Sequence, residues 1–421
     1  MSHPPLQSQS LNDWLFYIEQ SHPIEKIELG LARVQQVAAR ADLQQLPGIV
    51  VLIAGTNGKG TTARTLELLL QAQGFSVGVY SSPHLIRFNE RLRLNGQDVD
   101  DATWVQGMQA VEAVRGEVPL TYFEFTTLAA FAVLKQQQPD VCLIEVGLGG
   151  RLDATNIITP TISVITTIDL DHQDWLGHDR ETIGREKAGV FRANTPVVIG
   201  DLAAPQSVCL AADTLKCQTM QIGVQYQYAI DSDSWSWSSG CHRFDNLPRP
   251  HVPVQNVATA LACLELLQKL PSAAQLQQSL PQLALAGRMQ WLSQSPAVLL
   301  DVAHNPQSAQ YLSEQLQLLQ RNYRQIHLIA GMLKDKDIAQ ALSCFKGSNY
   351  QWHLLSLPGV RGAPAELLAS QLPASEQVAL VSQLPQLLDA IKASTADQLW
   401  VVFGSFVTVS EFIQLWTQDG K

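Results

Sequence analysis

The sequence lacks the features that mark several classes of protein. It contains 6 cysteines in 421 residues, and no two of them form a C-x-x-C pair, as is typical of chains in a reducing compartment. Apolar runs stay well below the roughly 18 residues of a membrane helix, and the N-terminus has no apolar signal-peptide core. Basic residues are outnumbered 38 to 28 by acidic ones. We therefore expect a cytoplasmic protein that binds neither nucleic acid nor membrane.

What is present is a glycine-rich loop between a predicted strand and a predicted helix. The apolar run 49–54 indicates a buried strand, the loop Gly55-Thr-Asn-Gly-Lys-Gly-Thr61 follows, and leucines at helical spacing come next. Glycines allow backbone N–H groups to approach phosphate oxygens, and Lys59 adds a positive charge. The spacing departs from G-x-x-x-x-G-K-[ST], which suggests a subtype of nucleotide loop. A role of Thr61 at a metal stays open.

Polar side chains recur near the predicted ends of the following strands. Glu145 lies in the strand 141–146, and a buried carboxylate must be paired or must coordinate a cation, so beside a phosphate loop we favour Mg²⁺. His172 follows the strand 162–168, and contact with metal or phosphate is favoured over a structural role. For Ser82, a solvated loop and a metal-binding hydroxyl remain equally compatible with its position. Residues 28–31 indicate either a helix start or a close approach to a ligand.

Other segments indicate the architecture. Residues 11–46 and 126–137 are predicted to be helical, residues 121–124 precede the second of these helices, and Asn256 opens a helix over 257–270. By charge alone, Lys187 is expected at the surface. Aromatic residues alternate at period two in the segment 218–255, which predicts core positions of a small antiparallel sheet. They are Tyr226, Tyr228, Trp235 and Trp237.

Alternating strand and helix patterns begin again near residues 281–289. Strand candidates at 298–301, 326–330, 352–355 and 399–403 alternate with helical segments at 307–320, 335–345, 383–393 and 405–416. This alternation predicts a second domain with a parallel sheet. We predict an α/β chain: an N-terminal P-loop-type ATPase domain (1–286) with a mostly parallel sheet plus a small antiparallel subsheet, and a C-terminal Rossmann-like α/β domain (287–421).

Six motifs in this order resemble the Mur ligase superfamily, and within it the bacterial bifunctional dihydrofolate synthase/folylpolyglutamate synthases. They are Gly55–Thr61, Tyr80-Ser-Ser-Pro-His84, Glu145-Val-Gly-Leu-Gly-Gly-Arg-Leu-Asp-Ala-Thr-Asn156, Asp171-His172, Gly184-Arg-Glu-Lys-Ala-Gly189 and Asp301-Val-Ala-His-Asn-Pro306. The resemblance runs from about residue 11 to the C-terminus. The unusual loop spacing is the family's own form.

The resemblance implies a set of functional residues. The implied ATP contacts are Thr56, Asn57, Gly58, Lys59, Asn256, Arg288 and Asp301. The implied magnesium residues are Ser82, Glu145 and His172, and the implied catalytic residues are Lys59, His172 and Lys187, the last carbamylated by CO₂. The implied dihydropteroate segments are Glu28, Leu29, Gly30 and Leu31, then Thr121, Tyr122, Phe123 and Glu124, then Leu152, Asp153 and Ala154. The family often has Asp in place of Glu28. The glutamate side chain keeps the negative charge but is longer than that of aspartate.

The activity implied by the resemblance is ATP-dependent ligation of L-glutamate through an acyl phosphate. The acceptors are 7,8-dihydropteroate, and tetrahydrofolate with its polyglutamates. The implied cofactors are ATP and two Mg²⁺ ions, with K⁺ as a further candidate, and the enzyme is expected to be a monomer whose domains close over the substrates. Two alternatives remain: a muramyl-peptide ligase of the same superfamily, and a nucleotide-switch NTPase that makes no ligated product.

Overall fold

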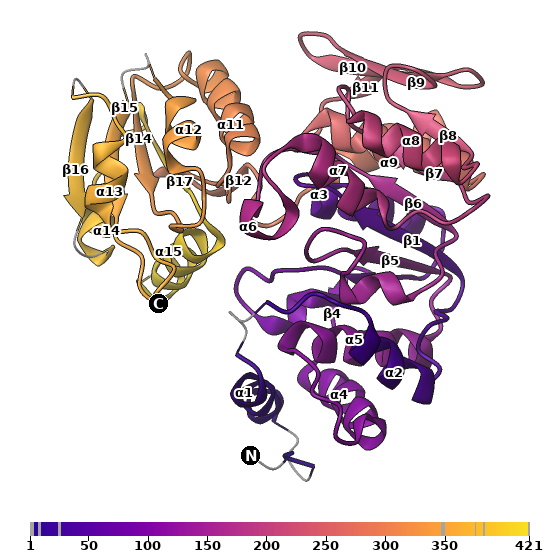
Figure 1. The fold of residues 1–421 in the computed structure, drawn as a ribbon. Helices are drawn as coiled ribbons and strands as arrows, with labels where there is room; N and C mark the ends of the chain where they lie inside the picture. The colour runs from indigo at the N-terminus through magenta and orange to yellow at the C-terminus, as the bar shows by residue number, and fades with distance from the viewer. Residues whose placement is uncertain are drawn as a thin grey trace. The chain divides into compact units, whose positions relative to one another are not determined.

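The computed structural model describes residues 4–6, 10–23, 27–346, 350–374, 376–381 and 384–419. The chain forms two compact units. The first comprises Met1–Ile168 and Leu176–Leu283, and the second comprises Asp169–Trp175 and Ala284–Lys421. Figure 1 shows the elements of each unit. The short segment Asp169–Trp175 therefore packs with the second unit, although it is flanked in sequence by the first.

The first unit is built on an eight-stranded sheet in the order β4-β3-β2-β5-β1-β6-β7-β8. The strands β2, β5, β1, β6, β7 and β8 are parallel, whereas β3 and β4 are antiparallel additions at one edge. Strands are present where they were predicted over 49–54, 141–146 and 162–168, but the last of these ends at Ile165, three residues earlier than predicted. The bounds of the strands in this sheet are β1 Ile49–Ala54, β2 Val77–Tyr80, β3 Leu92–Leu94, β4 Gln97–Asp98, β5 Val141–Glu145, β6 Ile162–Ile165, β7 Val197–Ile199 and β8 Thr219–Gln221.

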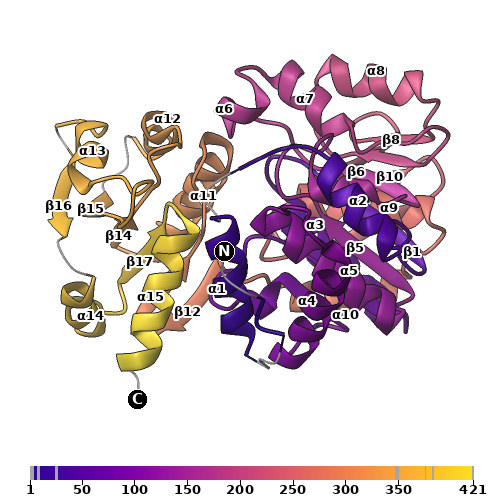
Figure 2. The same ribbon diagram turned by 60° about the horizontal axis from the view of Figure 1, so that its bottom comes forward.

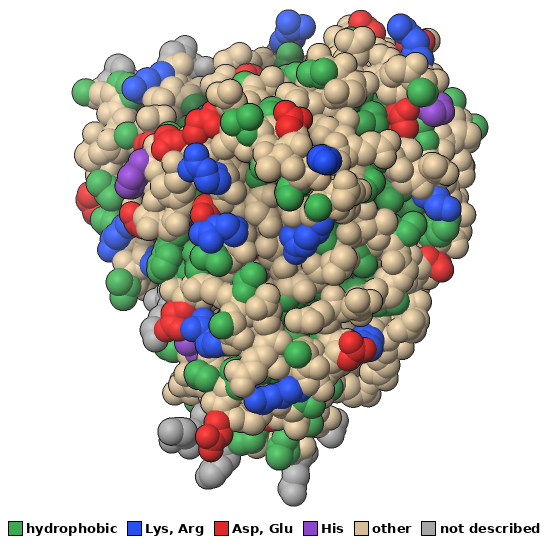
Figure 3. All heavy atoms as spheres, turned by 45° about the vertical axis from the view of Figure 1, so that its right-hand side comes forward, with side chains coloured by type: hydrophobic (Ala, Val, Ile, Leu, Met, Phe, Trp, Pro, Cys, Tyr) green, Lys and Arg blue, Asp and Glu red, His purple; other side chains and the backbone are tan. Residues whose placement is uncertain are grey.

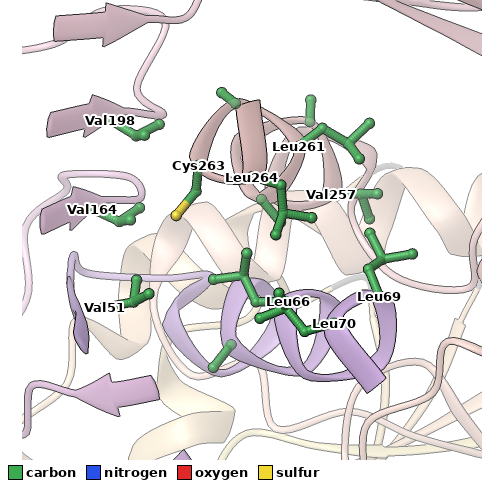
Figure 4. Close-up of a cluster of buried hydrophobic side chains, with 14 of the residues drawn as sticks. Val51, Leu66, Leu69, Leu70, Val164, Val198, Val257, Leu261, Cys263 and Leu264 are labelled. Atoms are coloured by element: carbon green, nitrogen blue, oxygen red, sulfur yellow. The ribbon is translucent and has the colours of Figure 1, made fainter. Parts of the chain in front are cut away.

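Helices cover the apolar strands of this sheet. The helices between residues 11 and 283 are α1 Leu11–Ser21, α2 Ala32–Arg40, α3 Lys59–Gln71, α4 Asp101–Arg115, α5 Tyr122–Gln137, α6 Gln173–Leu176, α7 Arg180–Ala188, α8 Gln206–Thr214, α9 Val254–Leu266 and α10 Ala273–Ser279. Helices α3 and α9 pack side by side, and leucines of both helices join valines of β1, β6 and β7 in one buried cluster (Figure 4). This burial holds the helix that follows the glycine-rich loop firmly on the sheet.

Three predicted helix boundaries are wrong. The stretch 11–46 is not one helical segment, because residues 27–31 lie outside helices and Gly30 has φ +148°; residues 24–26 of that stretch are outside the described residues. Helix α5 begins at Tyr122 because Thr121 and Glu124 form a reciprocal capping box, so 121–124 start the helix. Helix α9 begins at Val254, which places Asn256 in its first turn.

The predicted antiparallel subsheet is confirmed as the three-stranded sheet β11-β10-β9. Its strands are β9 Tyr226–Ile230, β10 Ser234–Ser239 and β11 Arg243–Pro248. Trp235 and Trp237 are fully buried, and the Trp237 indole N–H donates to the Ala258 carbonyl of α9 at 3.1 Å. The alternating aromatics are therefore core residues that fasten this sheet to α9.

The second unit contains a six-stranded sheet in the order β12-β13-β17-β14-β15-β16, parallel except for β12. The strands are β12 Gln290–Gln294, β13 Ala297–Leu300, β14 Gln325–Ala330, β15 Tyr350–Leu355, β16 Gln377–Val381 and β17 Gln398–Phe403. The helices are α11 Pro306–Leu319, α12 Ile338–Ser343, α13 Ala365–Ser370, α14 Pro385–Lys392 and α15 Phe406–Asp419. The predicted parallel sheet is confirmed; residue 383 of the helix predicted over 383–393 is outside the described residues.

The two faces of this second sheet bury different kinds of side chain. Side chains of α11, α12 and α13 form one apolar cluster with alternate residues of β13, β14, β15 and β17. Strand alternation turns His327, His353 and Trp400 toward the opposite face. Figure 2 shows α15 running alongside β17, and the Thr408 hydroxyl of α15 donates to the Gly331 carbonyl after β14 at 2.8 Å.

The surface drawn in Figure 3 carries acidic and basic side chains interspersed with apolar ones. Among the residues that the structure describes, no helix is both long enough and apolar enough to cross a membrane.

Candidate functional site

Four loops begin at the same edge of the first sheet. Strand β1 lies between β5 and β6, with Ile53 opposite Glu145 and Ala54 opposite Ile165. On the other side of β5, Tyr80 pairs with Ile144. The glycine-rich loop, the loop that starts at residue 146, residues 166–168 and Ser81-Ser82 therefore leave neighbouring strands side by side. This carboxyl edge is where parallel sheets bind ligands.

The glycine-rich loop has the geometry of a phosphate loop. Gly58 has φ +89°, and a Cβ at this position would collide with the Asn256 amide. Helix α3 begins at Lys59, whose Nζ donates to the carbonyl oxygens of Gly55 at 3.0 Å and Thr56 at 3.3 Å. Four of the predicted ATP residues, Thr56 to Lys59, thus lie at the amino end of a 13-residue helix, where anions are stabilised. Asn256 lies directly against them.

Lys187 lies beside the same loop. It is 4% exposed, and its Nζ donates to the Gly55 carbonyl at 2.9 Å. The surface position expected from charge alone is therefore wrong, because α7 presents this side chain to the sheet edge. Lys59 and Lys187 share the Gly55 carbonyl, so two of the three predicted catalytic residues are brought together.

The predicted metal residues fall into two groups. Glu145, 6% exposed, ends β5 next to the phosphate loop, and half-buried Ser82 follows β2. His172 has φ +51° and belongs to the segment that packs with the second unit. Among the described residues, no three His, Cys, Asp or Glu side chains cluster tightly enough to suggest a metal centre by themselves. A buried carboxylate and a hydroxyl beside a phosphate loop do fit the oxygen preference of Mg²⁺.

Arg33 joins two of the three predicted dihydropteroate segments, and a backbone hydrogen bond joins the third segment to the first. The Arg33 guanidinium donates to Glu28 Oε2 at 3.1 Å and to Glu124 Oε2 at 3.2 Å. The Gly30 amide also donates to the Leu152 carbonyl at 3.4 Å. Arg33 is a site residue that was not predicted, since a helical arginine off the apolar face gives no signal of its own. Arg33 joins segments that lie about 90 residues apart.

Within these segments, several side chains serve the local structure. Phe123 packs against Gly147, where a Cβ would lie 2.5 Å from its ring. Asp153 accepts hydrogen bonds from the Leu148 amide at 2.8 Å and the Thr155 hydroxyl at 2.6 Å, which closes the loop after β5. Burial raises the pKa of Asp153, against the opposing effect of these hydrogen bonds. Burial also raises the pKa of Tyr122 to about 12.

In the second unit, Arg288 and Asp301 lie close together. Asp301 accepts the Met289 amide at 2.9 Å and the Ala303 amide at 2.8 Å. Burial raises the pKa of Asp301, and the charge of Arg288 opposes this shift. The Arg288 guanidinium lies 5.2 Å from the Phe406 ring centroid. Two of the predicted ATP residues are thus held close together in the second unit.

A buried ion pair in the second unit was not predicted. Lys336 Nζ donates to Asp171 Oδ1 at 2.6 Å, and His304 Nε2 lies 3.6 Å from Asp171 Oδ2. Burial alone would raise the pKa of Asp171, but His304 and Lys336 hold it well below its ordinary value. The same Oδ1 accepts the His172 amide at 2.8 Å. Asp171 therefore shapes the turn that carries His172.

Comparison with known proteins identifies the class that this fold and site define. The family described as the Mur ligase middle domain matches residues 53–235. The family described as "Mur ligase, glutamate ligase domain" matches residues 287–406. The chain is accordingly a Mur-type ligase, an enzyme that forms carbon–nitrogen bonds.

Individual relatives narrow this class. Dihydrofolate synthase/folylpolyglutamate synthase of Escherichia coli (strain K12) is 43% identical over 412 residues, which is 98% of this chain and 96% of that protein. The structure of E. coli FolC in complex with DHPP and ADP has a TM-score of 0.94 at 41% identity and covers 100% of both chains. A bifunctional folylpolyglutamate synthase/dihydrofolate synthase with Mn, AMPPNP and L-glutamate bound has a TM-score of 0.90 at 42% identity, covering 99% of this chain and 100% of the other. The chain belongs to the dihydrofolate synthase/folylpolyglutamate synthase family.

These comparisons confirm the predicted family, fold class and ligase class. The roles of individual site residues, the identity of the metal and the carbamylation of Lys187 stay predictions.

Proposed function

We propose that this chain uses ATP to join L-glutamate to two kinds of acceptor. With 7,8-dihydropteroate the product is dihydrofolate, and with tetrahydrofolate or its polyglutamates the product is a longer folylpolyglutamate. The observation that carries the proposal lies in the first unit. A phosphate loop follows β1, and of the three acceptor segments Arg33 joins the first two, while the Gly30 amide bonds to Leu152 in the loop that follows the neighbouring β5. Relatives solved with an adenine nucleotide, with DHPP and with L-glutamate support it.

The proposed reaction has two steps. A carboxylate oxygen of the acceptor attacks the γ-phosphorus of ATP, the bond to ADP breaks, and an acyl phosphate forms. The amine of L-glutamate then attacks the acyl carbon, a C–N bond forms, phosphate leaves, and the amine proton is lost to solvent. Lys59 and the amide groups at the start of α3 offset negative charge on the phosphoryl oxygens.

We assign the magnesium ions to Ser82, Glu145 and His172, with K⁺ as a further candidate ion. Bound magnesium would offset charge on the phosphates. Carbamylation of Lys187 would replace an ammonium that repels the metal with an anionic oxygen donor, and the carbamate nitrogen would keep one N–H. A carbamate signal in ¹³C NMR after addition of ¹³C-bicarbonate, absent from Lys187→Ala, tests this assignment. Full activity of Lys187→Ala in bicarbonate-free buffer would contradict it.

We assign the acceptor to the segments 28–31, 121–124 and 152–154. Their backbone and aromatic groups suit a flat, hydrogen-bonding ring system, and Arg33 would keep the first two segments together. Arg288 and Asp301 are assigned to ATP. We further propose that the enzyme is a cytoplasmic monomer; its mass in light scattering tests the oligomeric part.

The deciding experiment measures ADP release with dihydropteroate and with tetrahydrofolate, each with and without L-glutamate. The proposal expects release that depends on glutamate and on either acceptor. Activity with tetrahydrofolate alone would contradict the bifunctional assignment. Release without glutamate or acceptor would favour a nucleotide switch, and activity with a UDP-linked muramyl substrate would favour a muramyl-peptide ligase.

A further inference from the structure

Two consecutive threonines after β6 hold the carbonyl group of Asn57 in the phosphate loop. The Thr166 hydroxyl lies 2.6 Å from the Asn57 carbonyl oxygen, and the Thr167 hydroxyl lies 3.1 Å from the same atom. The Thr56 amide donates to the Thr167 carbonyl at 2.6 Å. Thr166 is 1% exposed and Thr167 is 8% exposed. The loop is therefore bonded to the neighbouring strand through both side chains and backbone.

The position of Gly55 reflects the same arrangement. A Cβ at Gly55 would collide with the Thr166 hydroxyl. Thr166 Oγ1 also lies 3.3 Å from the Ala54 carbonyl oxygen, but a hydroxyl has one proton to donate, and the Asn57 oxygen is the nearer acceptor. The absent side chain at Gly55 thus makes room for the hydroxyl that holds Asn57.

Holding this carbonyl also sets the direction of an amide. In a planar trans peptide, the C=O of one residue and the N–H of the next point in opposite directions. Fixing the Asn57 carbonyl toward the threonines therefore turns the Gly58 N–H away from them. Glycine adopts positive and negative φ with similar ease, so the Asn57–Gly58 peptide would otherwise rotate readily. The two hydroxyls restrict that rotation.

We propose that Thr166 and Thr167 are positioning residues of the nucleotide site. They hold the Asn57–Gly58 peptide with its N–H available to a phosphate oxygen, so that binding does not have to order the loop. This inference rests on the proposed function, since it assumes that the loop binds ATP phosphates. The threonines themselves contact the loop, and they act on the nucleotide through it.

The test uses the full-length chain with valine in place of each threonine. Valine keeps the branched shape and removes the hydroxyl. Because a hydrogen bond of this kind contributes about 0.5–1.5 kcal/mol net, we expect Thr166→Val to weaken ADP binding about fivefold and the double variant about thirtyfold, as measured by calorimetry. KM for ATP should rise in parallel, while KM for L-glutamate stays unchanged. Thr166→Ser keeps a hydroxyl and should restore most of the affinity.

Ser163 provides a matched control in β6, the strand that precedes the two threonines. It is fully buried, and its hydroxyl donates to the Val190 carbonyl at 2.9 Å, outside the phosphate loop. Ser163→Ala should lower the melting temperature without changing ADP affinity. A purely stabilising role of the threonines would instead lower the melting temperature of Thr166→Val with ADP affinity within twofold of the wild type, which would overturn the inference.

Measuring ADP binding by the wild type distinguishes failure of the proposed function from failure of the positioning role. If the wild-type chain binds no ADP, the proposed function fails before the variants are compared. If the wild type binds ADP and the threonine variants bind it equally well, only the positioning role fails. Should Thr166→Val not fold, Thr167→Val tests the weaker of the two hydrogen bonds at a less buried position.

Discussion

The sheet edges of the two units are held by different kinds of interaction. In the first unit, the phosphate loop is held by the neutral hydroxyls of Thr166 and Thr167, which follow β6. In the second unit, the turn 169–175 is held by the buried ion pair of Asp171 with Lys336. Neutral hydrogen bonds contribute about 0.5–1.5 kcal/mol, whereas leaving one partner of a buried ion pair unpaired costs about 3–5 kcal/mol. Changes at the first edge should therefore cost less stability than changes at the second.

The largest expected effect is at Lys59. Lys59→Met removes a positive charge at the start of α3, so glutamate-dependent ADP release should fall about a thousandfold, with little change in melting temperature. Lys392→Met, an exposed position in the second unit, serves as the control and should leave both quantities unchanged. If Lys59→Met releases ADP at a rate within tenfold of the wild type, the proposed role of the phosphate loop in the reaction is wrong.

The comparison is sharpened by Lys336→Met in the second unit. The Lys336 side chain is 6% exposed and the Asp171 side chain 9%, so the variant leaves a buried charge without its main partner. We expect the free energy of unfolding to fall by about 3 kcal/mol in denaturant titrations. The double variant Asp171→Asn/Lys336→Met should recover part of this loss, since neither charge remains.

An exposed pair, Arg324 with Asp397, is the control: Arg324→Met should cost under about 1 kcal/mol. If Lys336→Met and Arg324→Met lower the free energy of unfolding equally, the pair of Asp171 with Lys336 is not effectively buried.

Site residues that are contiguous in the chain could be predicted from the sequence, whereas contacts between distant residues could not. Glycine spacing and strand ends locate Gly55, Gly58 and Lys59 because the phosphate loop is contiguous in the chain. Arg33 and Lys336 could not be assigned, because Arg33 reaches Glu124 across 91 residues and Lys336 reaches Asp171 across 165, and nothing local marks a helical arginine or a loop lysine. The strand β12 was missed because its residues are only partly buried, so the apolar alternation that marks a strand is weak.

Helix starts were the other source of error in the first unit. Thr121 and Glu124 form a capping box, which is visible in the sequence as T-x-x-E, yet the apolar pattern that follows begins later and shifted the predicted start. Lys187 was misplaced for a different reason: its burial depends on how α7 packs against the loop after β1, and charge alone carries no information on that packing.

A smaller effect should distinguish the second unit in its response to pH. His327 Nδ1 lies 3.1 Å from His353 Nε2, and the His327 ring stacks on Trp400. Burial, with a contribution from His353, lowers the pKa of His327 from 6.5 to about 4. The unfolded chain therefore binds more protons between these values, so stability is full above pH 6.5 and falls as the pH drops toward 4. We expect a loss of about 1–2 kcal/mol between pH 6.5 and pH 5.

Calorimetry on His327→Phe checks this pH dependence. The aromatic ring keeps the stacking on Trp400 but cannot take up a proton, so the variant should lose stability less steeply below pH 6.5 than the wild type. A wild type and a variant with identical slopes would show that the histidine pair does not contribute to acid sensitivity.

The smallest expected effect separates a helix cap from a substrate contact in the first unit. The Thr121 hydroxyl accepts the Glu124 amide at 3.1 Å, and Glu124 Oε2 accepts the Thr121 amide at 2.7 Å. Thr121→Ala should lower the free energy of unfolding by about 1 kcal/mol, and Thr121→Ser should restore it. Ser272→Ala is matched to it, because Ser272 caps α10 with Gln275 in the same reciprocal way. If both alanine variants lose similar stability but only Thr121→Ala raises KM for dihydropteroate, the cap also positions the acceptor segment. Unchanged KM values in both would restrict Thr121 to a structural role and weaken the assignment of 121–124 to the acceptor.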